Sequence, residues 1–151
     1  APGNTPIAQI AINAGFNELV AALSYVDAEL NTGLVDLFMN GTDQYTVFAP
    51  TDAAFNDLYA ALSINSIEDL PAELVRDVLL YHVVEGRRAA NSVLPKKGTK
   101  KITTLLGATF TVDTQGMITA VGNTANITPS NNISASNGII HVIDAVILPI
   151  N

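Results

Sequence analysis

The residues best suited to chemistry at neutral pH are two histidines, His82 and His141, the only ones in the chain. Imidazole titrates near neutral pH, so it serves as a general acid, a general base or a metal ligand. Asp144 follows His141 by three residues, and residues three apart in a strand point to opposite faces. Even if the two histidines met in space, no cysteine and no nearby cluster would complete the ligand set that zinc usually needs. The sequence therefore predicts no His–carboxylate dyad, no metal site and no cofactor.

Other catalytic patterns are missing as well. The chain has no G-x-S-x-G nucleophile elbow, no phosphate-binding P-loop and no G-x-G-x-x-G dinucleotide signature. It has 14 acidic residues, but nothing in their spacing pairs two carboxylates for acid–base work. These observations favour a protein that binds rather than one that catalyses.

Charge is distributed unevenly along the 151 residues, whose net charge is −7. Residues 1–75 hold ten acidic side chains and no basic one, and all 7 basic residues fall between Arg76 and Lys101. So acidic a chain is not expected to bind nucleic acid. Six basic residues form three pairs that could bind polyanions such as acidic polysaccharide or lipid headgroups: Arg87, Arg88, Lys96, Lys97, Lys100 and Lys101. Two alternatives are a solvated loop that balances the acidic helices, and a surface that docks on the acidic face of another copy.

Length and composition fit one domain over residues 1–151, since 48% of the residues are hydrophobic and a sizeable core can be buried. The longest apolar run, Ile139–Leu148, contains His141 and Asp144 and is too short to cross a bilayer, so no transmembrane segment is expected. The chain starts at Ala1 without Met, which is compatible with a mature protein after signal-peptide removal.

The spacing of apolar residues changes from helical in the first half to alternating in the second. Caps, stop signals and helical spacing predict helices at residues 5–15, 19–30, 34–39, 51–62 and 71–81. Strands are predicted at residues 45–49 and 82–85, with a hairpin of 109–113 and 117–121. The polar stretch Asn126–Asn132 is expected to be an irregular edge or loop. Ile139–Leu148 is apolar on both alternations, which predicts a central strand buried on both faces. The predicted fold class is α+β.

Three segments resemble the fasciclin domain, a secreted or cell-surface module of adhesion proteins. They are TVFAPTDAAF at Thr46–Phe55, YHVVEG at Tyr81–Gly86 and NGIIHVIDAVILP at Asn137–Pro149, in the family's order. The resemblance implies a β-wedge of two sheets with helices packed on one side, in which the first and last segments form neighbouring central strands. It implies structural roles for the motif residues Thr46, Phe48, Ala49, Pro50, Thr51, Asp52, Asn137, Gly138, His141, Asp144 and Pro149.

The resemblance also points to candidate partner-binding residues. In this family the Tyr-His pair, here Tyr81-His82, has been proposed as part of an integrin-type adhesion site; the alternative is a buried pair that tethers a helix to a strand through hydrogen bonds. Adhesive members often carry Asp-Ile before the last motif, where this chain has Asn132-Ile133. An amide ligates a divalent cation only weakly, and no Arg-Gly-Asp occurs, so animal-type integrin binding is disfavoured.

The leading hypothesis is a non-enzymatic interaction module that is secreted, exposed on a cell surface or periplasmic. Its partner would be a cell-surface or matrix protein or glycan. Low surface charge and abundant apolar side chains leave open a carrier that holds a small lipophilic ligand, a pigment or a lipid, in an apolar cleft between helices and sheet. Charge segregation leaves open a self-assembling surface protein, in which the acidic half of one copy meets the basic segment of the next.

Overall fold

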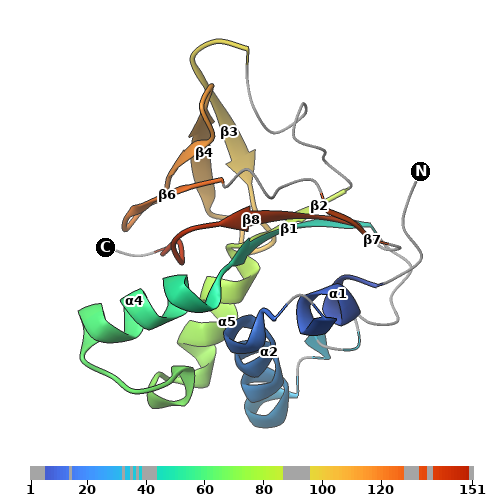
Figure 1. The fold of residues 1–151 in the computed structure, drawn as a ribbon, viewed down its shortest axis with the longest axis vertical. Helices are drawn as coiled ribbons and strands as arrows, with labels where there is room; N and C mark the ends of the chain where they lie inside the picture. Colours follow the sequence, from blue (N-terminus) through green and yellow to red (C-terminus); the bar gives the residue numbers. More distant parts are fainter. Residues whose placement is uncertain are drawn as a thin grey trace.

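The chain folds into two stacked β-sheets with helices beneath the first sheet (Figure 1). The computed structural model describes residues 6–13, 15–31, 33–34, 36, 38, 44–86, 96–127, 133–135 and 138–149. The first sheet has the strand order β2-β1-β8-β7 and lies between the helices and the second sheet, whose order is β3-β4-β5-β6. This arrangement confirms the predicted α+β class and the wedge of two sheets with helices on one side.

The helices begin and end close to their sequence signals. They are α1 (Ile7–Asn13), α2 (Asn17–Leu30), α4 (Asp52–Leu62), the 3₁₀ turn η1 (Ile67–Asp69) and α5 (Ala72–Leu80). Asn31 ends α2 in the left-handed conformation, and the Thr51 hydroxyl accepts a hydrogen bond from the Ala54 N–H at 3.1 Å to cap α4. Thr5 lies outside the described residues, and so do residues 35, 37 and 39 of the predicted helix at 34–39, whereas Leu34, Asp36 and Phe38 are helical. No helix in the described part of the chain is both long enough and apolar enough to cross a membrane.

The first sheet is built on a parallel pair. β1 (Tyr45–Pro50) runs alongside β8 (Gly138–Ile143) in the register Tyr45↔Gly138 to Pro50↔Ile143. β2 (Val83–Glu85) pairs antiparallel with the outer edge of β1, and β7 (Ile133–Ala135) does the same with β8. The expectation that the first and last motifs supply neighbouring central strands is thus confirmed.

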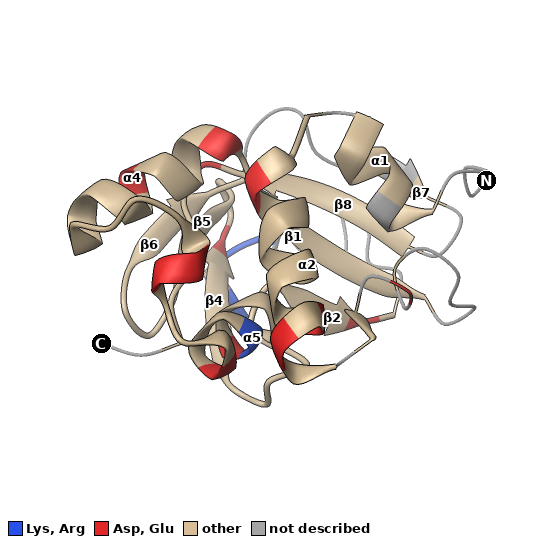
Figure 2. Ribbon diagram, turned by 90° about the horizontal axis from the view of Figure 1, so that it is seen from below, with Lys and Arg blue, Asp and Glu red and all other residues tan. Residues whose placement is uncertain are grey.

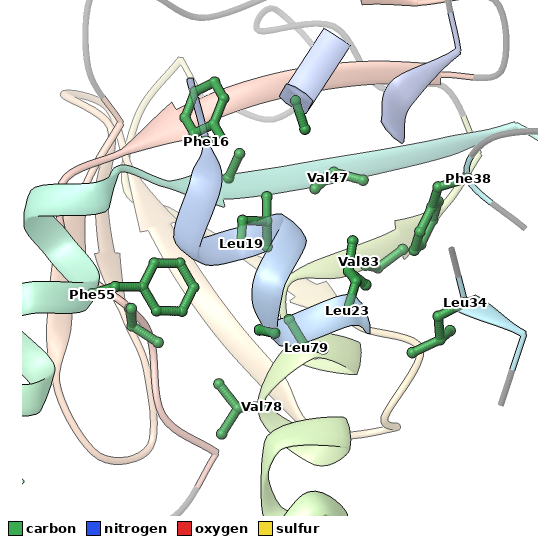
Figure 3. Packing of buried hydrophobic residues seen from close by; sticks show 14 of the residues in the cluster. Phe16, Leu19, Leu23, Leu34, Phe38, Val47, Phe55, Val78, Leu79 and Val83 are labelled. Atoms are coloured by element: carbon green, nitrogen blue, oxygen red, sulfur yellow. The ribbon is translucent and has the colours of Figure 1, made fainter. Parts of the chain in front are cut away.

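Both faces of this parallel pair are buried, as the apolar pattern predicts. Val47, Ala49, Ile140 and Val142 pack against the helices in a core that also contains Phe16, Leu19, Phe55 and Leu79 (Figure 3). Phe48 and Ile143 point the other way, into a second core between the sheets with Tyr81, Phe110, Val112 and Ile118. A strand that serves two cores is mostly apolar on both alternations, which explains the long apolar run that only the buried His141 interrupts within β8.

The second sheet consists of β3 (Thr99–Thr103), β4 (Thr109–Asp113), β5 (Met117–Thr119) and β6 (Thr124–Asn126). The predicted hairpin of β4 and β5 is confirmed by the antiparallel pair Val112↔Ile118. Sequence patterns did not indicate β3 or β6. Each buries a single side chain, Ile102 and Ala125 respectively, so neither shows an apolar alternation.

The last strand is shorter than predicted, because β8 ends at Ile143 rather than at Leu148. Asp144 turns the chain away from the first sheet: its N–H donates to the Asn126 carbonyl at 3.1 Å, and its carboxylate accepts from the Asn126 N–H at 2.7 Å. The residues that follow are apolar because Val146 and Ile147 are buried, at 3% and 0% exposure, and not because they extend the strand.

Replacing Gly138 with alanine should destabilise the protein by at least about 2 kcal/mol. A Cβ at this position would lie 1.8 Å from the Tyr45 carbonyl oxygen, a main-chain atom held in the β1–β8 ladder. Urea unfolding measures the loss. Gly98→Ala is the matched control, since Gly98 has a φ of +71° but open space around its Cβ direction. Equal losses in the two variants would show that the close approach to Tyr45 is not the cause.

Candidate functional site

Tyr81, the first candidate partner-binding residue, lies at the C-terminal end of α5 and is completely buried. Its hydroxyl donates to the Thr109 carbonyl at 2.6 Å and accepts from the Val121 N–H at 3.3 Å. The ring packs edge-on against Phe110, with centroids 5.8 Å apart. Burial raises the pKa of the Tyr81 hydroxyl. Tyr81 therefore fastens α5 to the open end of the β4–β5 hairpin in the second sheet.

His82 is 2% exposed, and both of its ring nitrogens are occupied by main chain. Nδ1 lies 2.6 Å from the Val78 carbonyl oxygen, and Nε2 lies 3.0 Å from the Ile147 nitrogen. The Ile147 N–H must donate, so Nε2 accepts and the proton sits on Nδ1. Burial lowers the pKa of His82 to about 4, because the charged imidazole would be desolvated. The neutral ring thus ties the end of α5 to the C-terminal segment.

These positions correct the assignment of Tyr81 and His82 as candidate partner-binding residues. In this structure neither side chain is presented at the surface, and the alternative of a buried tethering pair describes both residues. Asn132 lies outside the described residues, so its candidate role stays a prediction. Ile133 is half-buried at the start of β7, packed against the helical core, rather than in a loop.

The residues of the first motif are used in the same structural way. Thr46 is fully buried and donates through its hydroxyl to the Gly86 carbonyl at 2.7 Å, which holds the end of β2 against β1. Phe48 lies between the rings of Phe110 and His141, at centroid distances of 5.2 Å and 5.5 Å. Ala49 is buried on the helical face of β1, and Pro50 ends the strand opposite Ile143.

Asp52 also makes contacts with a second helix, which no sequence pattern predicts. It stands in the first turn of α4, as expected, but its carboxylate also accepts the Glu18 N–H at 2.9 Å, at the first turn of α2. The same carboxylate lies 3.4 Å from the Asn17 side-chain nitrogen. Glu18 in turn accepts from the Tyr59 hydroxyl at 2.8 Å. One carboxylate therefore joins the N-termini of two helices, where negative charge is favoured.

The last motif is also structural. His141 is fully buried against Phe48, whereas Asp144 is exposed beyond the end of β8. Pro149 is half-buried, and Asn137 lies outside the described residues. Asn123 was not singled out from sequence, yet its side chain donates to the Val146 carbonyl at 2.8 Å and accepts from the Leu148 N–H at 3.0 Å. No sequence pattern predicts that an asparagine will hydrogen-bond to a residue twenty-five positions away.

The basic candidates separate into described and undescribed residues. Lys96, Lys97 and Lys101 are exposed, and Lys100 is half-buried; Lys100 and Lys101 lie in β3, not in a loop. Arg87 and Arg88 fall outside the described residues. The start of β3 lies at the end of the molecule opposite the helices (Figure 1). Seen from the helical side, the charged residues on α2 and α4 are acidic (Figure 2).

Two apolar hollows bear on the hypothesis of a lipophilic ligand. A cavity among α1, α2, β1 and the end of α5 has a volume of about 20 Å³, which is room for about one water molecule. A larger groove of about 180 Å³ runs between α4, η1 and α5 and is lined by aliphatic side chains. Within the described part of the chain, no three His, Cys, Asp or Glu side chains gather as a metal site would require.

Comparisons with known proteins identify relatives across nearly the full chain. The family model described as "Fasciclin domain" matches residues 14–149. Immunogenic protein MPB70 of Mycobacterium bovis is 37% identical over 145 residues, covering 93% of this chain and 68% of the relative. Protein sll1483 of Synechocystis is 36% identical over 141 residues, covering 91% and 69%. Cell surface glycolipoprotein MPB83 of M. bovis is 33% identical over 147 residues, covering 95% and 60%.

A solved structure supports the same fold. The FAS1 domain pair from the insect cell adhesion molecule Fasciclin I superposes with a TM-score of 0.60 at 17% sequence identity. The match covers 91% of this chain and 46% of that one.

Removing the Tyr81 hydroxyl should cost about 1–3 kcal/mol of unfolding free energy, because Tyr81→Phe leaves the Thr109 carbonyl and the Val121 N–H without the hydroxyl of a completely buried side chain. Chemical denaturation measures the change. Tyr25→Phe is the matched control: the Tyr25 hydroxyl donates to the Leu70 carbonyl at 2.7 Å, but the residue is only half-buried and water can replace it. If both variants lost the same stability, burial would not be what makes the Tyr81 hydrogen bonds costly to remove.

The buried imidazole of His82 should make the protein less stable as the pH falls from 6.5 to 4. Above pH 6.5 His82 is neutral in both states; below it the unfolded chain takes up a proton, while the folded chain does so only near its pKa of about 4. Each pKa unit corresponds to about 1.4 kcal/mol, so the loss should reach about 3 kcal/mol.

Unfolding free energies measured between pH 7 and pH 4 test this expectation. His82→Gln is the comparison variant, since an amide cannot titrate in this range but can still accept from the Ile147 N–H. The variant should be less stable at pH 7 and lose less stability on acidification. Identical pH profiles would assign the acid sensitivity to carboxylates instead.

Proposed function

This chain belongs to the fasciclin domain family, and from that premise we propose that it is a non-enzymatic, extracytoplasmic adhesion or interaction module. Its partner is a cell-surface or matrix protein or glycan. One relative is by name a cell surface glycolipoprotein, and the structural neighbour comes from a cell adhesion molecule. Both names support an extracytoplasmic binding role here.

The observation that carries the proposal is that the described family-motif residues hold the fold together. Thr46, Tyr81 and His82 are buried with their polar atoms bonded to main chain, and Asp52 and Asp144 accept main-chain N–H groups. Residues whose polar groups are bonded to the main chain in this way contribute to the stability of the fold rather than to the recognition of a partner. Partner binding then falls to exposed side chains outside the motifs, where one fold can serve many partners.

The exposed surface with the most distinctive chemistry is the basic tip, which we define as Lys96, Lys97 and Lys101 at the start of β3. All three side chains are exposed. They lie just before and within β3, which begins at the end of the molecule away from the helices (Figure 1). Clustered lysines create a positive potential that draws in anionic surfaces, including acidic glycans and acidic protein faces. We assign partner contact to this tip.

The carrier hypothesis gains less support. An interior cavity of about 20 Å³ is far smaller than the 300–1,000 Å³ typical of ligand pockets. The groove between α4 and α5, at about 180 Å³, is also below this range. A hollow of about 400 Å³ between β2 and the end of β3 lies within the range, but Glu85, Thr103 and Thr104 are among its lining residues, which does not suit a purely lipophilic ligand.

Neutralising the basic tip should weaken retention on an immobilised sulfated polysaccharide. The triple variant Lys96→Gln, Lys97→Gln and Lys101→Gln removes three charges without shortening the side chains by much, and it should elute at clearly lower salt than the parent. The arginine triple at the same positions is the control and should elute like the parent. Unchanged elution of the glutamine variant would remove the tip from the contact surface.

A further inference from the structure

The helical side of the molecule carries an aliphatic groove of about 180 Å³ between α4, η1 and α5. Eight side chains line it, and none of them is polar: Leu58, Leu62, Ile67, Leu70, Leu74, Val75, Val78 and Leu148. Leu62 is 46% exposed at the end of α4, a high exposure for a leucine next to other aliphatic residues. Of the other lining residues, Leu58, Leu70, Leu74 and Leu148 are half-buried and Ile67, Val75 and Val78 are buried, so the groove is an aliphatic hollow in the surface. A hollow of this kind can receive the apolar part of a partner's side chains.

Exposed carboxylates neighbour several lining residues of this groove in the sequence. Asp57 precedes the lining residue Leu58, Glu68 and Asp69 stand between Ile67 and Leu70, and Glu73 precedes Leu74; all four are exposed. Desolvation raises the pKa of the nearby Tyr25, and the carboxylates of Glu29, Glu68, Glu73 and Asp69 raise it further, so several negative charges share this region. The described cation beside them, Arg76, is paired with Asp77 at 3.3 Å.

The groove therefore fits a partner surface that combines positive charge with hydrocarbon. Lysine side chains have this composition, since their four-carbon stems lie along apolar surface while the ammonium group reaches a carboxylate. The chain itself supplies such a surface in the basic tip, where Lys96, Lys97 and Lys101 are exposed. Met117, 42% exposed at the start of β5, adds an apolar side chain near the same end of the second sheet.

We propose that the acid-rimmed groove of one molecule receives the basic tip of a second copy of this chain. The proposal rests on the assignment of the tip as the contact surface and names its anionic partner. The tip and the helical face lie at opposite ends of the molecule's long axis, so one molecule cannot close the contact on itself (Figure 1). Each copy keeps a free tip and a free groove, and a head-to-tail contact of this type propagates in a line.

Exposed charge pairs are individually weak and are screened by salt. Association should therefore be modest at low ionic strength and should weaken at least about tenfold between roughly 0.01 M and 1 M salt, where the Debye length falls from about 30 Å to about 3 Å. Sedimentation velocity of the whole chain over a concentration series, at both ionic strengths, measures this.

A charge exchange between two variants identifies the surfaces. The tip variant carries Lys96→Glu, Lys97→Glu and Lys101→Glu; the groove variant carries Asp57→Lys, Glu68→Lys and Glu73→Lys. Each variant alone should sediment as a monomer, because its two surfaces now have the same sign. Their mixture should associate again, because the unaltered tip of one meets the unaltered groove of the other. Recovery on mixing also shows that both variants are folded, and the lysine-to-arginine tip variant should associate like the parent.

Three outcomes would overturn the proposal: a monomer at every ionic strength, association that ignores ionic strength, or a mixture that stays monomeric although both variants unfold cooperatively. A copurifying lipophile whose retention is lost in Leu62→Asp would also overturn it, by giving the groove another occupant. A monomeric chain that still binds the sulfated polysaccharide through its tip would refute self-association and leave the proposed function standing.

Discussion

The parallel pairing of β1 with β8 is the constraint on which the rest of the molecule depends. The two strands come from opposite ends of the chain, and their pairing fixes one layer that serves two cores at once. On one face the helices pack against Val47 and Ile140; on the other, the second sheet packs against Phe48 and Ile143. Gly138 lets the strands meet, because its missing Cβ leaves room for the Tyr45 carbonyl.

The buried polar residues solve a problem that this layered arrangement creates. Main-chain groups where α5 meets β2 and where β8 ends are removed from water without belonging to a sheet ladder, and unpaired buried groups are costly. His82 bonds to Val78 and Ile147, and the Tyr81 hydroxyl bonds to Thr109 and Val121. Asn123 bonds to the Val146 carbonyl and the Leu148 N–H, which follow the last strand. The exposed Asp144 carboxylate accepts from the Asn126 N–H at the end of β6. A few polar side chains thus satisfy main-chain groups at the junctions between the layers.

Sequence patterns predict those parts of the fold in which local chemistry and burial agree. Thr51 caps α4, Asn31 ends α2, and the double-sided apolar run of β8 indicates a central strand, because each signal has a local cause. The missed strands β3 and β6 carry one buried side chain each and are held by pairing with distant residues. The strand predicted at Ile139–Leu148 is too long for the opposite reason. Val146 and Ile147 are apolar because they are buried in the core, although Asp144 has already turned the chain away from the first sheet.

The candidate site shows the same division. A Tyr-His pair between a helix and a strand looks the same in the sequence whether it binds a partner protein or is buried at a junction. Only its hydrogen-bond acceptors in the fold, the Thr109 and Val78 carbonyls, distinguish the two roles. The separation of acidic from basic residues, by contrast, can be read directly from the sequence. Whether it produces two separate charged surfaces depends on the fold. Lysines and carboxylates on adjacent surfaces would neutralise one another; the fold instead places the basic tip and the acidic helices at opposite ends. A molecule with that polarity presents one positive and one negative surface, each directed outward. The uneven distribution of charge along the sequence thereby becomes two charged surfaces that are available for contact.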